Sequence, residues 1–284
     1  MSRAPTVCVT VDFDGHALWL QWDSALSPTR MSRADFGGEV GMPRLLDLFA
    51  TEEVLATIYV PGHTVETFPE VCRRAVAEGH EIGHHGYLHK DHTRLSEAQE
   101  RAEFERAFAA YDKVLGLRPT GFRAPGGDLS TDTLRLAAEF GIGHDASGMG
   151  HDVLPYYARR GDRWTPDGPL RRGEPLDVVT LPVLSSMIDV PQMDFLIQPP
   201  ISGLHGYDKI LRMWLDELDW MCQTLPDGVL TLILHPSSAP RGARLRVVRD
   251  FLRHARSRGV QFRRHREVAA RFRAENPFSP AAPC

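Results

Sequence analysis

The stretch Val11-Asp12-Phe13-Asp14-Gly15 ends an apolar, β-rich run that begins at Thr6. In a β-strand, side chains two residues apart point to the same face, so Asp12 and Asp14 leave the strand together while Phe13 faces the core. Two carboxylates this close repel each other unless a cation, a proton or an arginine offsets their charge. Taken alone, the pair also fits two strand-end residues that cap the following loop. The stretch therefore predicts a strand with a functional or capping carboxylate pair at its carboxyl end.

Short β-rich runs alternate with helix-like segments along the chain, a pattern typical of βα units around a mainly parallel sheet. The expected strands are 6–11, 55–60, 81–83, 120–122, 142–145, 178–183 and 229–234. The expected helices are 43–52, 69–78, 96–115, 132–140, 207–222 and 245–256. The fold class that follows is α/β, an irregular (β/α) barrel of about seven or eight strands. We expect one domain over residues 1–284, with segments near 16–41 and 147–176 that cover the site.

The stretch His84-His85-Gly86-Tyr87-Leu88-His89 places two imidazoles four residues apart. His85 and His89 can meet one ion from a helical turn, or from a bent loop that nearby glycines permit. Two neutral imidazoles with one carboxylate form a ligand set typical of zinc and similar divalent ions, with a water position left open. A cluster of surface histidines is the alternative, since three more histidines lie within 80–92.

Two further strand ends carry polar residues. Arg123-Ala124-Pro125-Gly126-Gly127 follows the expected strand at 120–122. Its arginine can pair with a catalytic carboxylate, and its proline and glycines can shape a tight wall, although such a string is often only a turn. His235 follows the apolar run 229–234, where an imidazole is suited to act as a general acid or is simply held by the backbone. Both motifs lie where barrel enzymes place their sites.

The 284-residue chain has an ordinary globular composition, with 25% charged residues and a formal net charge of −4. This balance offers no general attraction to nucleic acid or to an anionic membrane, so we expect neither partner. The arginines within 241–273 alternate with apolar residues, as on a solvated helix face. Scattered cysteines favour free thiols in a reducing compartment, and no apolar run reaches the length of a membrane span. With no secretory signal in view, we expect a cytoplasmic protein.

Asp-x-Asp, His-x-x-x-His, Arg-x-Pro-x-Gly, a strand-end Asp145 and a strand-end His-Pro follow one another on successive βα units. In this order the chain, over about 6–262, resembles the NodB-homology or polysaccharide deacetylase family (carbohydrate esterase family 4) of metal-dependent amide hydrolases. The stretches 32–37, 40–46 and 59–64 resemble an intracellular branch with peptidoglycan-deacetylase-like, cyclic imide hydrolase and allantoinase-like members. That branch tends toward homo-oligomers, so the resemblance implies a dimer or a tetramer.

The resemblance implies that a divalent metal is held by three ligands, Asp14, His85 and His89. Zn²⁺ is the ion that we expect, with Co²⁺, Mn²⁺ and Ni²⁺ as alternatives. Two departures from the family pattern stand out: Gly86 replaces the usual Ser or Thr after the first histidine, and Phe13 separates the two carboxylates. The wider spacing fits the intracellular branch, in which some relatives dispense with metal. Because all three ligands are present here, we expect a bound ion.

The remaining roles also come from the resemblance. It makes Asp12 the general base, His235 the general acid, and Arg123 the residue that keeps Asp12 charged and aimed. Asp145 is expected to orient His235 or another group in the pocket wall. A backbone N–H near 59–62 is expected to help stabilise the oxyanion.

The substrate follows less directly from the sequence. The residues that we expect to bind it are Trp19, Tyr59, Pro125, Gly126 and Met149. Trp22, Met187 and Met193 lie in segments expected near the site, with core filling as the alternative for each methionine. An enclosed apolar pocket favours a small amide, cyclic imide or ureide as the leading hypothesis. N-deacetylation of an N-acetylated sugar, peptidoglycan fragment or glycosylated natural product is the second, and a non-catalytic binding protein on the same fold is the third.

Overall fold

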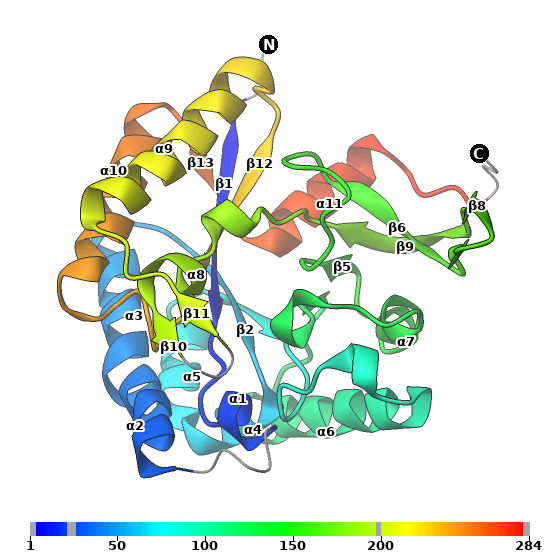
Figure 1. The fold of residues 1–284 in the computed structure, drawn as a ribbon, viewed down its shortest axis with the longest axis horizontal. Coiled ribbons are helices and arrows are strands. Elements are labelled where there is room, and N and C mark those ends of the chain that lie inside the picture. Colours follow the sequence, from blue (N-terminus) through cyan, green and yellow to red (C-terminus); the bar gives the residue numbers. More distant parts are fainter. Residues whose placement is uncertain (1–3, 22–26, 197–199, 281–284) are drawn as a thin grey trace.

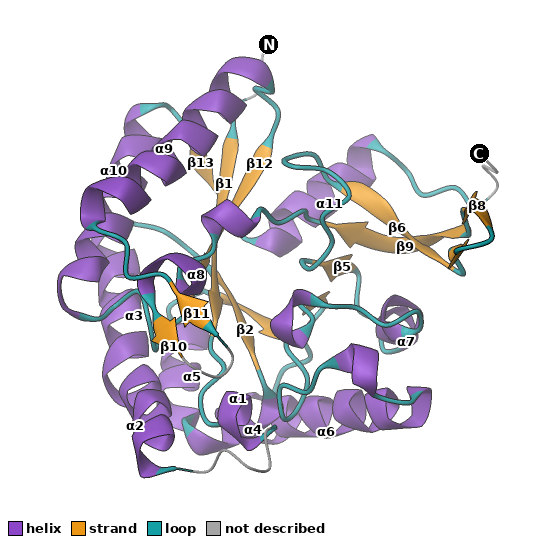
Figure 2. Ribbon diagram, in the orientation of Figure 1, coloured by secondary structure: helices purple, strands orange, loops and turns teal. Residues whose placement is uncertain are grey.

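The structure, a computed structural model, describes residues 4–21, 27–196 and 200–280. A curled, mainly parallel sheet lies at its centre with helices packed around it (Figures 1 and 2). Neighbouring strands follow the order β12-β1-β2-β3-β4-β5-β9-β6, and β13 pairs with the first residues of β1. The strands of this sheet are β1 (Thr6–Asp12), β2 (Thr57–Val60), β3 (Glu81–His84), β4 (Gly121–Phe122), β5 (His144–Asp145), β6 (Tyr156–Arg160), β9 (Glu174–Thr180), β12 (Val229–Leu234) and β13 (Gln261–Phe262).

Helices connect successive parallel strands, as expected for βα units. They are α1 (Ala17–Leu20), α2 (Pro28–Phe36), α3 (Met42–Thr51), α4 (Gly62–Thr67), α5 (Pro69–Ala77), α6 (Glu97–Leu115), α7 (Thr133–Glu139), α8 (Val190–Met193), α9 (Tyr207–Thr224), α10 (Leu245–Ser257) and α11 (His265–Glu275). Each helix expected from the sequence is present to within two residues at either end. None of the described helices combines the length and the apolar composition that crossing a membrane requires. The expected irregular (β/α) barrel is confirmed, in the form of a curled half-barrel.

Local sequence signals account for the helix ends. The Ser96 hydroxyl accepts a hydrogen bond from the Gln99 backbone N–H, and the Gln99 side chain accepts one from the Ser96 backbone, so α6 begins with a complete capping box. Gly116 ends the same helix with a left-handed backbone, at a φ of 63°. Buried helices and strands then enclose one main hydrophobic core, which contains Phe13 as expected.

The sheet register brings the carboxyl ends of several strands to one edge. Asp12 is opposite Tyr59, His84 is opposite Phe122, and each ends or nearly ends its strand. On the other side of β1, Val11 is opposite Leu234 at the end of β12. Because parallel strands end at the same edge, the polar residues that follow them converge there. This convergence creates the site described below.

Residues 147–176 are expected to cover the site, but in the structure most of them lie elsewhere. Strand β6 runs antiparallel to β9 at the end of the sheet. Two further strands, β7 (Arg163–Thr165) and β8 (Gly168–Arg171), form a hairpin that stands out from the body (Figure 1). Both faces of this hairpin are exposed, so its sequence lacks the alternation of apolar and polar residues that identifies a strand. The other segment expected to cover the site, 16–41, does reach it through residues of α1 and α2.

Replacing Gly41 by alanine tests the packing that holds the segment after β12. A Cβ there would lie 1.9 Å from the carbonyl oxygen of Pro236. The backbone of Gly41 is helical, with φ −69°, so this contact alone opposes the change. We expect Gly41→Ala to lower the free energy of unfolding by about 1–3 kcal/mol in chemical denaturation. Gly168→Ala, at an open position, is the matched control, and equal unfolding midpoints for the two variants would contradict the prediction.

Candidate metal centre and active site

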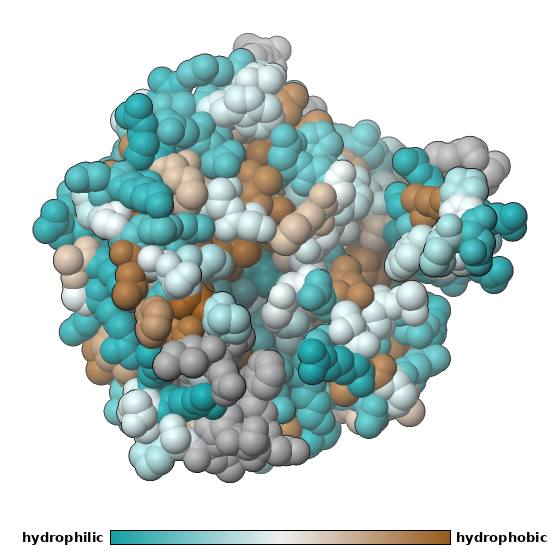
Figure 3. All heavy atoms as spheres, in the orientation of Figure 1, coloured by the Kyte–Doolittle hydropathy of each residue, from teal (hydrophilic) through white to brown (hydrophobic). Residues whose placement is uncertain are grey.

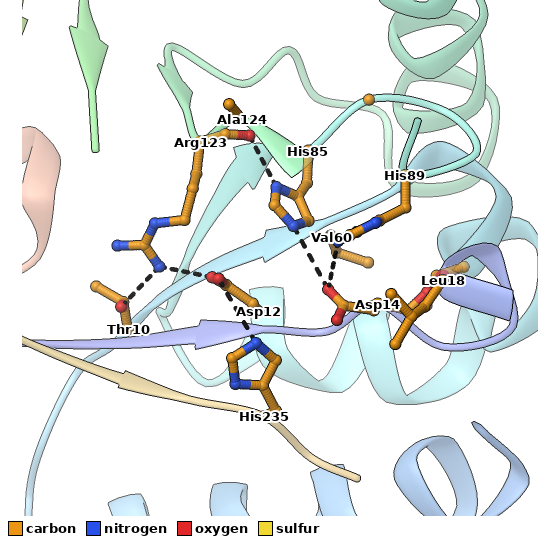
Figure 4. Close-up of polar contacts among 12 residues, drawn as sticks. Thr10, Asp12, Asp14, Leu18, Val60, His85, His89, Arg123, Ala124 and His235 are labelled. Carbon is orange, nitrogen blue, oxygen red and sulfur yellow. Dashed lines mark hydrogen bonds and ion pairs between the residues drawn. The ribbon is translucent and has the colours of Figure 1, made fainter. Parts of the chain in front are cut away.

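Asp14, His85 and His89 lie together at the carboxyl ends of β1 and β3 (Figure 4). Oδ1 of Asp14 is 3.4 Å from Nε2 of His85 and 3.6 Å from Nε2 of His89, and all three side chains are buried. Among the described residues, Oδ1 of Asp14 and Nε2 of His85 have no hydrogen-bond partner. Buried polar atoms normally find a partner, so these atoms form a donor set that fits one divalent cation.

Outer contacts turn the two imidazoles toward Asp14. Nδ1 of His85 donates a hydrogen bond of 2.7 Å to the carbonyl oxygen of Arg123, and this leaves Nε2 as the free lone pair. The side-chain amide of Gln21 lies 3.1 Å from Nδ1 of His89. Burial lowers the pKa of His89 to about 4, so its imidazole is neutral, as a metal ligand must be. Burial alone would raise the pKa of Asp14, but His89 and His85 outweigh it and hold that pKa below its usual range.

The segment that carries both histidines is a bent loop rather than a helical turn. Gly86 has a φ of 69° and His89 a φ of 55°, both in the left-handed region. The carboxylate of Glu103 accepts hydrogen bonds from the backbone of Tyr87 and Leu88, which holds the loop from below. A left-handed backbone favours glycine, and this accounts for Gly86 at the position where the family pattern has Ser or Thr. His89, a larger residue with the same strain, is held at the site by this loop.

Arg123 binds Asp12 on the far side of the site from the loop. Its Nη1 donates to Oδ1 of Asp12 at 2.5 Å and to the Thr10 hydroxyl at 2.9 Å. Its Nε donates to the carbonyl oxygen of Ala146 at 2.8 Å. The guanidinium lies over the ring of Tyr59, with 4.4 Å between the carbon and the ring centroid. With its plane held from several sides, Arg123 gives the Asp12 carboxylate one orientation.

His235 faces Asp12 and is held by an acidic residue that sequence analysis missed. Nδ1 of His235 lies 2.6 Å from Oδ1 of Asp189, and its Nε2 is 3.9 Å from Oδ2 of Asp12. The second oxygen of Asp189 accepts from the backbone N–H groups of His235 and Ala239. Burial alone would lower the pKa of His235, but Asp189 outweighs it and raises that pKa to about 10. His235 is therefore a protonated donor at neutral pH.

The expected role of Asp145 in orienting His235 is wrong, because Asp189 occupies that position. Asp145 instead accepts hydrogen bonds from the hydroxyl and backbone N–H of Ser147, at 2.7 and 3.1 Å. Ser147 lines the cavity, so Asp145 does orient a group in the pocket wall, the other role foreseen for it. The available signal for Asp189 was its place between Ile188 and Val190. A lone carboxylate in an apolar run is unusual unless it is buried with a partner.

A cavity of about 400 Å³ opens above these residues and has mostly apolar walls. Figure 3 shows it as a hollow, with hydrophobic side chains gathered beside it over the small antiparallel pair β10 (Phe195–Leu196) and β11 (Ile201–Ser202). The lining contains Asp12, Asp14, Leu18, Trp19, Arg33, His85, His89, Arg123, Gly126, Gly127, Ala146, Ser147, Met149, Val183, Ile188, Val190, Pro191, Asp194, Leu196, Ile201, Ile233, His235 and Ser237.

Of the five residues expected to bind substrate, three line the cavity and two do not. Trp19, Gly126 and Met149 line the cavity. Tyr59 is fully buried beneath Arg123 and Pro125 lines a neighbouring cavity, so neither faces the main one as expected.

Two methionines and one backbone N–H expected near the site are not available to substrate. Met187 and Met193 are buried in the hydrophobic core, the alternative that the sequence left open, and Trp22 lies outside the described residues. The N–H of Gly62 donates to the carbonyl oxygen of Gly86. That N–H is therefore not free to bind an oxyanion in the expected way.

Comparisons with known proteins agree with this geometry. A family model described as polysaccharide deacetylase matches residues 14–143. The chain is 33% identical to a peptidoglycan deacetylase of Helicobacter pylori, over 98% of this chain and 99% of that protein. A crystal structure assigned to the polysaccharide deacetylases, from Mycobacterium smegmatis, has 30% identity and a TM-score of 0.84, and the match covers 100% of this chain and 95% of that one. The PuuE allantoinase structure, at 24% identity, has a TM-score of 0.79 and shares the fold over 97% of this chain and 92% of its own.

The chain therefore belongs to the polysaccharide deacetylase family. This confirms the resemblance stated from the sequence. The class of activity follows as well: the protein is a hydrolase of carbon–nitrogen bonds other than peptide bonds.

Removing either imidazole should remove the metal. We expect His85→Ala and His89→Ala each to lose bound divalent ion and activity together, because two ligands cannot replace a three-ligand site. Metal content by mass spectrometry of the purified protein, with hydrolysis measured in parallel, provides the test. His151→Ala is the control, since His151 is exposed and lies outside the cavity. Alanine variants that kept full activity in the presence of a chelator would contradict the metal centre.

Asp189→Asn should move the alkaline limb of the pH–rate profile. With Asp189 present, His235 stays protonated until the pH approaches its raised pKa of about 10. Without the negative charge of Asp189, the pKa of His235 falls toward the ordinary value of about 6.5. The imidazole then loses its proton at a lower pH, and the general acid is lost there. We expect kcat to decline at lower pH in the variant than in the wild type. Superimposable alkaline limbs would show that Asp189 does not hold the proton of His235.

Proposed function

We propose that the protein removes the acetyl group from N-acetylated amino sugars of peptidoglycan or its fragments. The observation that carries this proposal is the arrangement of Asp12 and His235, each held by its own buried partner, beside the Asp14–His85–His89 ligand set. A general base, a general acid and a cation site are what amide hydrolysis requires. The substrate class rests on the Helicobacter pylori relative named a peptidoglycan deacetylase, which matches over nearly its whole length. This evidence favours the sugar, the second hypothesis from the sequence, over a small amide or imide.

In this proposal Asp14, His85 and His89 hold a divalent ion. Zn²⁺ is the preferred ion, with Co²⁺, Mn²⁺ and Ni²⁺ as alternatives. Imidazole and carboxylate ligands in this number suit zinc and leave a position open. When bound, such an ion polarises the amide carbonyl and lowers the pKa of water from about 16 toward about 7. Neutral His89 and ionised Asp14 are the protonation states that this ligand set needs.

The protein's own groups then handle the protons. Asp12 accepts a proton from the attacking water, and Arg123 keeps its carboxylate aimed through the hydrogen bond to Oδ1. His235 donates its Nε2 proton to the nitrogen of the leaving amine, while Asp189 holds its Nδ1. Because Nε2 of His235 lies 3.9 Å from Oδ2 of Asp12, base and acid face the same small volume. A substrate amide placed there meets both groups without movement of the backbone.

A small cyclic imide or ureide is the second candidate substrate. The cavity walls favour it, since Leu18, Val183, Ile188, Val190 and Ile233 present apolar surface to whatever binds. A cavity of about 400 Å³ is large enough for a single ring. The structural neighbour named an allantoinase shares this fold.

The expected homo-oligomer, a dimer or tetramer, remains part of the proposal. The hairpin β7–β8 stands out from the body and exposes Trp164 and Leu170, whose exposed fractions are 65% and 49%. Exposed apolar side chains on a projecting hairpin support a contact with a second copy. We also keep the expected cytoplasmic location, which is supported by the free thiols of Cys8, Cys72 and Cys222.

Acetate release decides between the two substrate classes. We expect the purified protein to release acetate from N-acetylated amino sugars and peptidoglycan fragments, and to lose this activity in a chelator. Allantoin, hydantoin and succinimide are assayed beside them under the same conditions. Asp12→Asn is the matched variant, in which the folded site keeps its shape but loses the base. Turnover of the ring amides alone would overturn the proposal and favour the second candidate.

A further inference from the structure

Arg33 stands in the cavity wall without a role in the reaction described above. It lies in the last turn of α2, is half-buried, and lines the same cavity as Asp12 and His235. Its hydrogen bond within the described residues is a long contact, 3.5 Å from Nη2 to the carbonyl oxygen of Phe195. Arg33 also belongs to the stretch Ser32-Arg33-Ala34-Asp35-Phe36-Gly37, which the metal and the proton transfers leave unexplained.

The carboxylates that line the cavity are already engaged. Asp12 pairs with Arg123 at 2.5 Å, and Asp194 pairs with Arg244 at 2.7 Å. Asp14 faces the two imidazoles of the candidate metal centre. In the part of the chain that the structure describes, no carboxylate oxygen lies within 4.0 Å of the Arg33 guanidinium. Among the described residues, Arg33 is therefore a cavity-lining cation that no carboxylate pairs with.

Two further guanidinium groups contact this part of the cavity wall, although neither is among the described residues that line it. Arg244 pairs with Asp194, and Arg241 donates to the carbonyl oxygen of Ser237. Burial lowers the pKa of Arg241, and the charges of Arg33 and Arg244 act in the same direction. Arg241 stacks on the ring of Phe36, 3.8 Å from its centroid, and forms no ion pair with the described residues. Asp194 is the carboxylate that balances this group of three. Three guanidinium groups with this one carboxylate leave excess positive charge beside the apolar part of the cavity wall.

We propose that Arg33 binds a carboxylate carried by the substrate close to its N-acetyl group. The inference rests on the proposed deacetylation and narrows it to acidic N-acetylated amino sugars, such as those with a carboxylate-bearing ether. A guanidinium matches a carboxylate through two parallel hydrogen bonds, a geometry that lysine cannot reproduce. The carboxylate supplies a counter-ion for Arg33, while the apolar walls pack against the ring. The acidic sugar is then oriented with its amide toward Asp12 and His235.

Binding measured apart from turnover tests the inference. The ligands are N-acetylmuramic acid, its uncharged amide, and N-acetylglucosamine, which lacks the acidic ether. We expect the protein to bind the acid about tenfold to a hundredfold more tightly than the amide, the range expected for hydrogen bonds to a charged group. Calorimetric titration, or quenching of the cavity-lining Trp19, gives the affinities without any need for catalysis.

Variants of Arg33 separate charge from shape. Arg33→Ala should abolish the preference for the acid over its uncharged amide. Arg33→Lys keeps the charge but not the paired hydrogen bonds, so it should keep only part of the preference. Arg212→Ala, on an exposed face of α9, is the control and should behave as wild type. Circular dichroism and the thermal midpoint confirm that each variant is folded.

The outcomes distinguish this inference from the proposed function. Deacetylation of both sugars, with equal binding of acid and amide, would overturn the role of Arg33 and leave the deacetylase intact. Selective binding of the acid that depends on Arg33, with no acetate released from any sugar, would overturn the proposed reaction and support the anion site. Selective binding together with a kcat/KM for N-acetylmuramic acid that falls about tenfold or more in Arg33→Ala would support both.

Discussion

The ion pair between Arg123 and Asp12 is the contact on which the arrangement of the site depends. Arg123 comes from the segment after β4, and its guanidinium reaches Thr10 and Asp12 on β1 and the carbonyl of Ala146 after β5. Its own carbonyl accepts the Nδ1 proton of His85, so the same residue fixes the base and one candidate metal ligand. A guanidinium buried to this extent is costly unless its charge and its donors are engaged. Any packing of the strands that separated these groups would therefore be strongly unfavourable.

Buried hydrogen-bonded contacts also hold the side chains on the opposite side of the site and beneath it. Asp189 is completely buried, and both of its oxygens are occupied by His235 and the backbone around it. The ring of Tyr59 supports the guanidinium of Arg123, while its hydroxyl lies 2.7 Å from Nδ1 of His265 on α11. Polar side chains thus continue from the cavity floor into the barrel interior. Networks of this kind orient groups in a low dielectric, where each contact is stronger than in water. Among the described residues, Nη2 of Arg123 is the guanidinium nitrogen that has no hydrogen-bond partner.

Chemistry and specificity come from different parts of the fold. The groups that handle protons, and those that can hold the metal, follow strands of the parallel sheet, except Asp189, which reaches the site beside an isolated bridge to β12. The walls come instead from the connecting segments, with Trp19 and Arg33 before α3 and the apolar residues between β9 and α9. Connections can change without disturbing the strand ends. One fold can therefore hold different pockets over the same strand ends, and the structure named an allantoinase shares the fold of this chain.

The sequence by itself determined the βα order, the strand ends and the family. Side chains alternate along a strand, which puts Asp12 and Asp14 on the same face. Parallel strands end at one edge of the sheet, so local patterns were enough to predict which motifs would meet. Only the tertiary structure decided that Asp189 rather than Asp145 holds His235, because that contact spans 46 residues and no local period encodes it. It also placed Tyr59 beneath Arg123 instead of in the cavity, and put Arg33 in the cavity wall with no carboxylate of the described residues paired to it. Such outcomes depend on how connections of irregular conformation pack in three dimensions, and no periodic pattern in the chain specifies that packing.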